Sequence, residues 1–168
     1  MYAGLRRLVG HPWRLLDLSA EQAEVKLGPQ GTTLIKSFET CRLAAYLPTP
    51  ADVPTLGWGH TRAVALGDTC TQEQADAWFL EDVAWAEDCV NRAITQLINQ
   101  QEFDALVSLC FNIGCKAFSG STLVKDLNRL DFDSASDQFL VWDKQHGQVL
   151  AGLLNRRKAE QELFNQTA

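Results

Sequence analysis

The sequence predicts a mainly α-helical (α+β) domain with one small β-hairpin near its beginning. Three observations lead to this prediction. Apolar residues recur at intervals of three or four over most of the chain after residue 70, as in amphipathic helices. Two short strand-like runs flank a proline-rich turn between residues 42 and 59. The 168 residues are 46% hydrophobic, which is enough for one domain with its own core.

Residues 1–31 are expected to form an N-terminal extension of a domain at 32–168. Glycines and a proline interrupt any long helix early in this segment, and the run Gly-Pro-Gln-Gly at 28–31 ends it. It is either a docked extension without chemistry or an interaction or delivery segment. Its arginines interrupt the apolar core that a secretory signal requires. No stretch of the chain reaches the roughly 18 apolar residues of a membrane span.

A short helix and the hairpin are predicted next. Thr32 or Thr33 is a suitable N-cap for the helix "LIKSFET", which places Glu39 near its end. The runs "RLAAYL" and "VPTLGWG" then predict two strands around "PTPAD". Three prolines in this segment indicate an exposed, edge-like hairpin, because proline has no backbone N–H to donate.

Two longer helices follow the hairpin. A capping box at Thr71 and Gln74 starts a long amphipathic helix whose apolar positions continue to Leu97. The next run, "EFDALVSLCFNI", is apolar over so much of its surface that we expect it at the centre of the domain, ending at Gly114.

Shorter helices are predicted for the C-terminal third, at 121–129, 134–142 and 155–164. Asp133 or Ser134 is expected to cap the middle one. With the preceding elements, they complete a helical domain into which one small hairpin is inserted early.

The net charge of −6 is not spread evenly, since residues 62–105 hold nine acidic and two basic residues. Proteins that bind nucleic acid need a basic surface, so this balance argues against that class. It is also unfavourable for electrostatic capture by anionic cell envelopes.

The five cysteines cannot all pair within one chain, and their spacing lacks the CxxC pairs of a zinc ribbon. Cys89 and Cys110 fall in apolar helical patterns, where a reduced cysteine acts as a small hydrophobe. We therefore expect free thiols in a protein that folds in a reducing compartment. The histidines have no neighbours at metal-ligand spacing, so no metal site is predicted.

Three residues around the hairpin form a candidate catalytic set. Glu39 ends an apolar helix, where partial burial favours the protonated carboxyl that a general acid requires. Asp52 in the turn and Thr55 in the second strand are suited to position a water on the opposite face of a sugar, as in glycosidases. Each also has a simpler interpretation, as a solvated helix end, a turn-forming aspartate or a strand threonine.

Other polar and aromatic residues are weaker candidates. Trp58, between two glycines, either stacks on a sugar or packs internally, and His60 is more often a structural histidine than a catalyst. The basic run at 156–158 is expected at the start of the last helix, where cations are unfavourable. It is either paired with a carboxylate such as Glu39 or an anionic ligand, or a solvated basic patch.

Three motifs, in order, resemble the phage-type lysozymes, the endolysin muramidases of tailed bacteriophages. The run "LIKSFETCRLAAY" with "PTLGWGHT" resembles the family's catalytic helix and hairpin. The run "ALVSLCFNIGCKAFSGSTLVKDLN" resembles its central buried helix and the turn after it, and "GLLNRRKAEQELF" resembles its closing helix. The resemblance covers about residues 33–165.

This resemblance implies a two-lobed lysozyme-like fold, with the hairpin at the cleft and a long helix joining the lobes. It implies hydrolysis of the β-1,4 bond between N-acetylmuramic acid and N-acetylglucosamine, without a cofactor. Glu39 matches the family's proton donor, Thr55 its catalytic threonine and Arg156 the arginine that pairs with the acid. Further cleft contacts are implied for Phe111 and for Ser121 or Thr122.

The sequence departs from the family at the second carboxylate. The family's aspartate usually lies nine residues after the glutamate, where this chain has Pro48. Asp52 is the only carboxylate in the loop, and we expect the longer turn to fold it back over the same space. Otherwise Thr55 and a water act alone beside Glu39.

The expected protein is an endolysin that degrades peptidoglycan and lyses the host cell. The alternatives are a lytic transglycosylase, in which the sugar's own 6-hydroxyl closes a ring, and an inactive wall-binding or virion protein. The expected partners are peptidoglycan glycan strands, with no nucleic acid and no membrane anchor, and a monomer is expected. Without a signal peptide, a protein made in the host cytoplasm would reach the wall through a pore such as a phage holin, or inside a virion.

Overall fold

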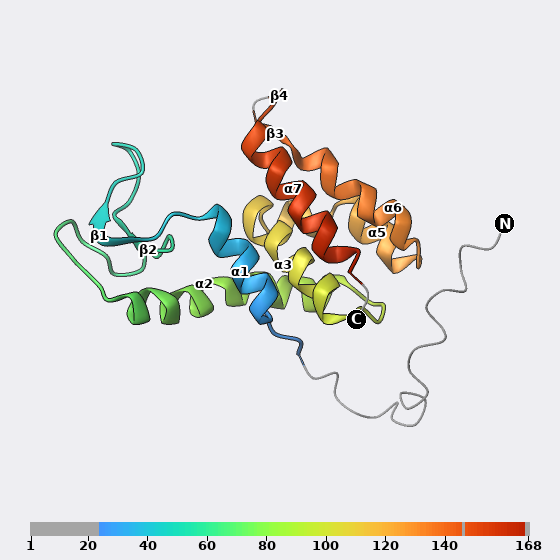
Figure 1. Ribbon diagram of the computed structural model, residues 1–168, viewed down its shortest axis with the longest axis horizontal. Coiled ribbons are helices and arrows are strands. Elements are labelled where there is room, and N and C mark those ends of the chain that lie inside the picture. The colour runs from blue at the N-terminus through green and yellow to red at the C-terminus, as the bar shows by residue number, and fades with distance from the viewer. Residues whose placement is uncertain (1–23, 146, 167–168) are drawn as a thin grey trace.

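Residues 24–145 and 147–166 are described by the structure, a computed structural model. The segment 1–23, to which most of the expected N-terminal extension belongs, lies outside them. A long helix, α2 (Gln72–Ala93), extends from a small hairpin of β1 (Arg42–Tyr46) and β2 (Thr55–Gly57) to the group of remaining helices (Figure 1). The prediction of a mainly α-helical domain with one small hairpin inserted early is confirmed.

The first helix, α1 (Pro29–Phe38), begins earlier than predicted. Its N-cap is Gly28 rather than Thr32 or Thr33, and its first position is a proline. Proline suits this position because its fixed φ is helical and its missing N–H would have no partner there. The Thr33 hydroxyl instead donates to the Pro29 carbonyl at 2.9 Å. The expected boundary between residues 31 and 32 thus falls inside α1.

Asp104 of α3 (Gln100–Ile113) fixes the start of α1. Its carboxylate accepts the N–H groups of Gly28 and Gly31, each at 2.8 Å. Two backbone donors that have no partner inside the helix are thereby satisfied. Gly31 permits this approach, because a Cβ there would lie 2.7 Å from the Asp104 Cβ.

Both long helices begin with a capping box, which the sequence predicts for α2. The Thr71 hydroxyl accepts the Gln74 N–H, and the Gln74 side chain accepts the Thr71 N–H. Asn99 and Glu102 form the same reciprocal pair at α3. The prediction that α2 extends to Leu97 is wrong, because the helix ends at Ala93 and Leu97 is exposed beyond it.

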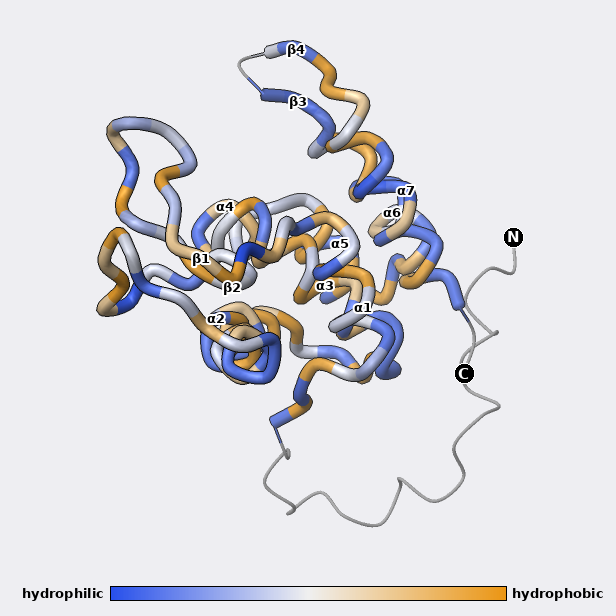
Figure 2. Tube along the Cα trace, turned by 60° about the vertical axis from the view of Figure 1, so that its left-hand side comes forward, coloured by the Kyte–Doolittle hydropathy of each residue, from blue (hydrophilic) through white to orange (hydrophobic). Residues whose placement is uncertain are grey.

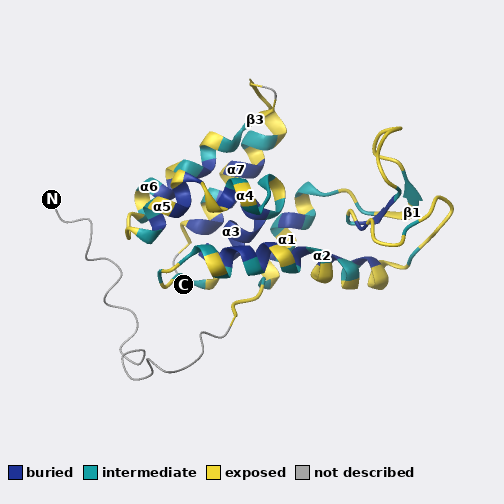
Figure 3. Cartoon of the chain, turned by 180° about the vertical axis from the view of Figure 1, so that it is seen from behind, coloured by how far each residue is buried: buried dark blue, intermediate teal, exposed yellow. Residues whose placement is uncertain are grey.

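The core lies around α3, as predicted. The residues from Glu102 to Cys110 are all buried, and the helix ends at Gly114. Figure 3 shows α3 in the middle of the molecule in the buried colour, and the hydrophobic colour of Figure 2 gathers in the same place. None of the helices in the described part of the chain is both long and apolar enough to cross a membrane.

The C-terminal third contains α4 (Cys115–Ser119), α5 (Thr122–Asn128), α6 (Phe132–Asp137), the 3-10 helix η2 (Gln138–Trp142), β3 (Lys144–Gln145), β4 (Gln148–Val149) and α7 (Ala151–Phe164). The single helix expected at 134–142 is therefore divided between α6 and η2. Asp131, not Asp133 or Ser134, caps α6 by accepting the Ser134 N–H at 3.1 Å. The last helix begins four residues before the expected position 155.

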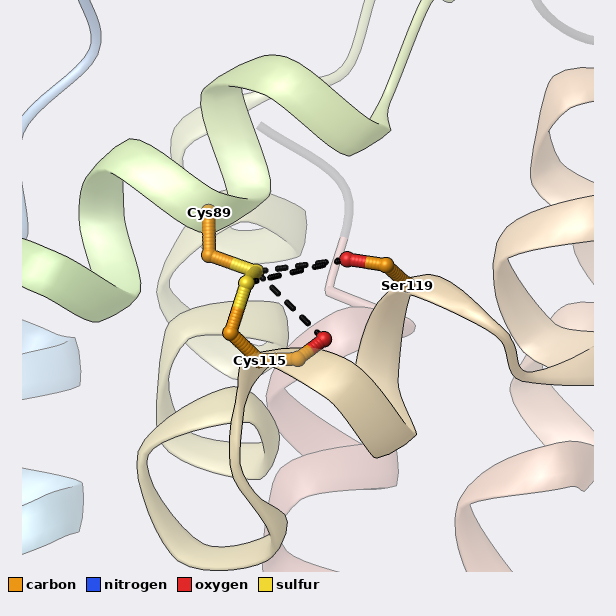
Figure 4. The surroundings of a disulfide bond; sticks show 3 residues. All are labelled: Cys89, Cys115 and Ser119. Carbon is orange, nitrogen blue, oxygen red and sulfur yellow. Dashed lines mark hydrogen bonds between the residues drawn. A yellow bond between two sulfur atoms is a disulfide. The ribbon is translucent and has the colours of Figure 1, made fainter.

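A disulfide joins Cys89 of α2 to Cys115 of α4 (Figure 4), so the expectation of five free thiols is wrong. The two Cα atoms lie 5.9 Å apart, which suits a disulfide. The Ser119 hydroxyl lies 3.4 Å from the Cys89 Sγ, which has no proton and therefore accepts. Helical spacing correctly predicts that Cys89 lies on an apolar face of its helix. It cannot reveal which cysteine later in the chain packs against that face. The free cysteines of the described chain are Cys41, Cys70 and Cys110.

Candidate active site

Glu39 lies where the end of α1 meets the C-terminal helix α7. It is the C-cap of α1, and from it the chain leads into β1. Its side chain is 29% exposed, so solvent reaches a carboxyl that is otherwise covered. Glu39 Oε1 accepts a hydrogen bond from Arg156 Nη1 at 2.9 Å. A carboxyl held in one place and open on one side is suited to transfer a proton to a bound molecule.

Arg156 lies in the second turn of α7, and its side chain is 5% exposed. All three guanidinium nitrogens have partners. Nη1 donates to Glu39, Nε to Glu160 Oε1 at 3.2 Å, and Nη2 to the Ser108 carbonyl at 3.5 Å. The sequence placed this arginine at the start of the helix and inferred a partner from the helix dipole. That reason is wrong because α7 begins earlier, but the structure does bring Arg156 to Glu39.

The two hairpin candidates differ in their surroundings. Thr55 is buried at the start of β2, opposite Tyr46, and its hydroxyl donates to the Val53 carbonyl at 3.1 Å. Asp52 is exposed in the turn between the strands, where its backbone N–H donates to the Thr49 carbonyl at 3.0 Å. Among the described residues, no hydrogen bond or ion pair joins the side chain of Asp52 to Glu39.

Trp58 belongs to a group of side chains that ties α1 to the first turns of α2. Its indole Nε1 donates to Asp76 Oδ1 at 2.7 Å, and the same oxygen accepts Lys36 Nζ at 2.6 Å. The Lys36 ammonium also lies 5.0 Å from the Trp58 ring centroid. Hydrogen bonds from Lys36 and Trp58 lower the pKa of the Asp76 carboxyl. Trp58 therefore packs between α1 and α2 while it stays partly exposed, and its stacking on a sugar remains a prediction.

His60 ties the turn after β2 to α2. Its Nδ1 lies 2.8 Å from Asp82 Oδ2, and its ring stacks on Trp78 with centroids 4.7 Å apart. The side chain is buried. These contacts give His60 a structural role in joining the turn to α2.

The remaining predicted residues lie on the helical side. Phe111 is half-buried, with its ring 5.9 Å from Trp85 in a stacked contact. Ser121 is buried and caps α5, its hydroxyl accepting the Val124 N–H at 3.2 Å. Thr122 is exposed at the first position of that helix. The cap accounts for Ser121 without a ligand.

Sequence patterns identified neither Glu160 nor Ser108 behind Arg156, and they did not place Arg157 of the basic run beside them. Glu160 and Arg157 of α7 and Ser108 of α3 are buried together, although charged residues are usually exposed. The four-residue spacing of Arg156 and Glu160 is a signal for a pair, but it indicates an exposed helical pair as readily as a buried one. In the described part of the chain, no group of three or more His, Cys, Asp or Glu residues could hold a metal ion.

Comparison with known proteins places this site in a family. The phage lysozyme family model matches residues 36–160, which include Glu39, the hairpin and Arg156. The endolysin of Acyrthosiphon pisum secondary endosymbiont phage 1 is 44% identical over 142 residues, which are 82% of this chain and 97% of the relative. The endolysin of Salmonella phage P22 is 39% identical over 145 residues, with 83% and 98% covered.

Solved structures agree with the sequence relatives and confirm the predicted two-lobed lysozyme-like fold. The muramidase domain of SpmX from Asticaccaulis excentricus has a TM-score of 0.78 and 36% identity, covering 84% of this chain and 99% of that chain. A P22 lysozyme structure has a TM-score of 0.78 and 37% identity over the same shares. Because a family model matches most of its length and its relatives are covered almost end to end, this chain belongs to the phage lysozyme family of cell-wall-degrading hydrolases.

Proposed function

We propose that the protein is a muramidase that hydrolyses the β-1,4 bond between N-acetylmuramic acid and N-acetylglucosamine in bacterial peptidoglycan. The observation that carries the proposal is the Glu39–Arg156 pair beside the hairpin, a partly exposed carboxyl fixed by a buried guanidinium. The similarity to phage endolysins and to a muramidase domain supports this choice among glycosidases.

In the proposed mechanism, protonated Glu39 donates its proton to the glycosidic oxygen as the bond breaks. The Arg156 guanidinium, 2.9 Å away, stabilises the carboxylate that remains. A water held by Thr55 and Asp52 attacks the anomeric carbon from the opposite face of the sugar. Because water rather than a protein carboxylate attacks, the configuration at that carbon inverts. Every group in these steps belongs to the chain, the glycan or solvent, so no cofactor takes part.

Thr55 and Asp52 contribute unequally to this proposal. Thr55 is fixed at the start of β2, whereas Asp52 lies in an exposed turn that we expect to close over the bound glycan. The exposure of Asp52 is the observation that favours a second candidate, a lytic transglycosylase. In that reaction Glu39 acts without a second carboxylate, and the sugar's 6-hydroxyl replaces water.

The biological setting proposed for this activity is lysis of the host cell from within. A protein made in the cytoplasm would meet peptidoglycan after release through a membrane pore such as a holin, or be delivered in a virion. It would act as a monomer on glycan strands. The Cys89–Cys115 disulfide is compatible with work outside the reducing cytoplasm.

The proposal is tested by mass spectrometry of the fragments released from purified peptidoglycan. We expect fragments with reducing muramic acid ends from the wild-type protein and none from Glu39→Gln. Ends lighter by one water, the anhydro form, would show a transglycosylase instead. Glu162→Gln, at an exposed position of α7, is the matched control and should release fragments like the wild type. Binding to peptidoglycan without release by any of the proteins would indicate a wall-binding module.

A further inference from the structure

We infer that Glu160 is a positioning residue of the active site, whose buried carboxylate holds the Arg156 guanidinium in the orientation in which Nη1 meets Glu39. The inference rests on the proposed function, because it concerns the same site. Glu160 would touch neither substrate nor water and would act only through Arg156.

Glu160 lies at the meeting point of α3 and α7 and is completely buried. Its Oε1 accepts three hydrogen bonds, from Ser108 Oγ at 2.6 Å, Arg156 Nε at 3.2 Å and Arg157 Nη2 at 3.3 Å. The Ser108 bond is the shortest of the three and comes from a different helix. It therefore fixes the carboxylate relative to α3 as well as α7.

The shape of guanidinium makes this contact directional. Its nitrogens lie in one plane, so fixing two of them fixes where the third points. In Arg156, Glu160 holds Nε and the Ser108 carbonyl holds Nη2, which leaves Nη1 directed at Glu39. The Phe38 ring lies 5.6 Å from the guanidinium carbon and covers it. Without the bond to Nε, only the longer 3.5 Å contact of Nη2 with the Ser108 carbonyl would hold the plane from the α3 side.

Charge gives a second reason. Arg157 is fully buried beside Arg156, and its Nε lies 3.1 Å from Glu160 Oε2 in an ion pair whose angle does not make a hydrogen bond. Asn112 accepts Arg157 Nη2 at 2.9 Å but adds no charge. Glu160 therefore supplies the negative charge for Arg157. Without it, among the described residues, Arg157 would lose its ion-pair partner and Arg156 would keep Glu39 alone.

Stability alone explains this arrangement poorly. Burial raises the pKa of the Glu160 carboxyl, and the charge of Arg157 only opposes that rise, so the ionised group is costly to bury. Buried ion pairs are often no more stabilising than apolar side chains of similar volume. The presence of this buried carboxylate is better explained by a need to orient Arg156, the arginine that holds Glu39.

The test compares Glu160→Gln with the exposed control Glu162→Gln, each alone and combined with Arg156→Ala. The substrate is a soluble peptidoglycan oligosaccharide, and all assays are run well below the melting temperature of each variant. We expect Glu160→Gln to lower kcat by about tenfold with little change in KM. The displaced arginine would misplace Glu39 in the transition state but would leave substrate binding unchanged. Glu160→Gln should not lower kcat further when it is combined with Arg156→Ala, because a residue that acts through Arg156 has no effect once Arg156 is absent. Glu162→Gln should change neither constant.

The same factor of loss with and without Arg156 would overturn the inference, as would a Glu160→Gln variant that behaves like the control. If Glu160→Gln does not fold, Ser108→Ala removes one anchor without changing charge and should show a smaller kcat loss with the same dependence on Arg156. A readout independent of activity is the Arg156 Nε–H signal in NMR. It should exchange slowly with solvent in the wild type and in Glu39→Gln, and rapidly in Glu160→Gln or, if that variant does not fold, in Ser108→Ala. If it stays slow, Glu160 does not position Arg156, whether or not the proposed muramidase activity is found.

Discussion

Two carboxylates near the hairpin are each held by one cation, Glu39 by Arg156 and Asp76 by Lys36. Glu39 has no other hydrogen-bond partner for its side chain among the described residues. Asp76 also accepts bonds from Trp58 and Gln72, all of them on the same oxygen, and so joins α1 to α2. We therefore give Asp76 a structural role and propose Glu39 as the proton donor.

The pairing of Asp76 predicts a pH dependence of stability. Its pKa in the folded protein is lower than its ordinary value of 3.8, because Lys36 and Trp58 donate to the carboxylate. The stability that this pair contributes is therefore complete above pH 3.8 and is lost as the pH falls through the lower, folded value. We expect the melting temperature of Asp76→Asn to lie below that of the wild type near neutrality and the difference to shrink in acid. A difference that grows in acid would contradict this assignment.

Asp52 is the residue whose role depends most on movement of the turn. If the turn closes over the glycan, Asp52→Asn removes the group that orients the attacking water, and kcat should fall by about 100-fold or more. The exposed Asp133→Asn is the matched control and should have wild-type kinetics. Wild-type kcat in Asp52→Asn would leave Thr55 as the residue that holds the water.

Among single residues, the contact between Glu39 and Arg156 could be predicted from recognisable motifs, whereas the catalytic role of Thr55 stays a prediction. Asp76, Asp82 and Glu160 could not be predicted, because each is an ordinary acidic residue on a helix until its partner from another element is known. Asp76 contacts Trp58 and Asp82 contacts His60, and these partners lie 18 and 22 positions away in the sequence. Glu160 contacts Arg156 on the same helix, but the sequence does not reveal which face of that helix is buried.

At the scale of elements, the packing between helices distinguishes Gly31 from Gly152, although the sequence alone does not. Gly31 lies in α1, where an added Cβ would meet Leu27 Cδ1 at 2.5 Å and the Asp104 side chain at 2.7 Å. Gly152 lies in α7, where nothing is within 4 Å of an added Cβ. One glycine is required by packing and the other is not.

The two alanine substitutions should therefore have opposite effects. Gly152→Ala should raise the free energy of unfolding by about 0.5–1 kcal/mol, because alanine is the better helix former. Gly31→Ala should lower it by about 1–3 kcal/mol through overpacking against Asp104. Urea unfolding of both variants measures this, and a stabilising Gly31→Ala would show that α1 and α3 are less closely packed than described.

The disulfide should contribute strongly to the helical side of the molecule. It links α2 to α4 across 26 positions of sequence, and a loop of that length corresponds to about 3 kcal/mol of stabilisation. We expect a reducing agent, or Cys115→Ser, to lower the melting temperature by about 10 °C. Cys41→Ser should respond to reductant like the wild type, since Cys41 is free. A wild-type melting temperature unaffected by reductant would mean that the bond does not form or does not matter.

At the scale of the whole molecule, most of the architecture could be predicted from the sequence. The periodic helices, the capping box at Thr71 and the buried α3 follow from local pattern, and the motifs supply the two-lobed arrangement. The start of α1, the division between α6 and η2 and the Cys89–Cys115 bond could not be predicted. The start of α1 depends on the contact of Asp104 with its first turn, and the disulfide joins residues 26 positions apart, so neither can be recognised from local pattern.

The central claim is that Glu39 drives the attack of water on a muramic acid linkage. Digestion of purified peptidoglycan in ¹⁸O-labelled water, followed by mass spectrometry of the fragments, tests it most directly. The account predicts one ¹⁸O atom at each new N-acetylmuramic acid reducing end with the wild-type protein, and no new ends with Glu39→Gln. New ends without label, or label carried on N-acetylglucosamine, would contradict it.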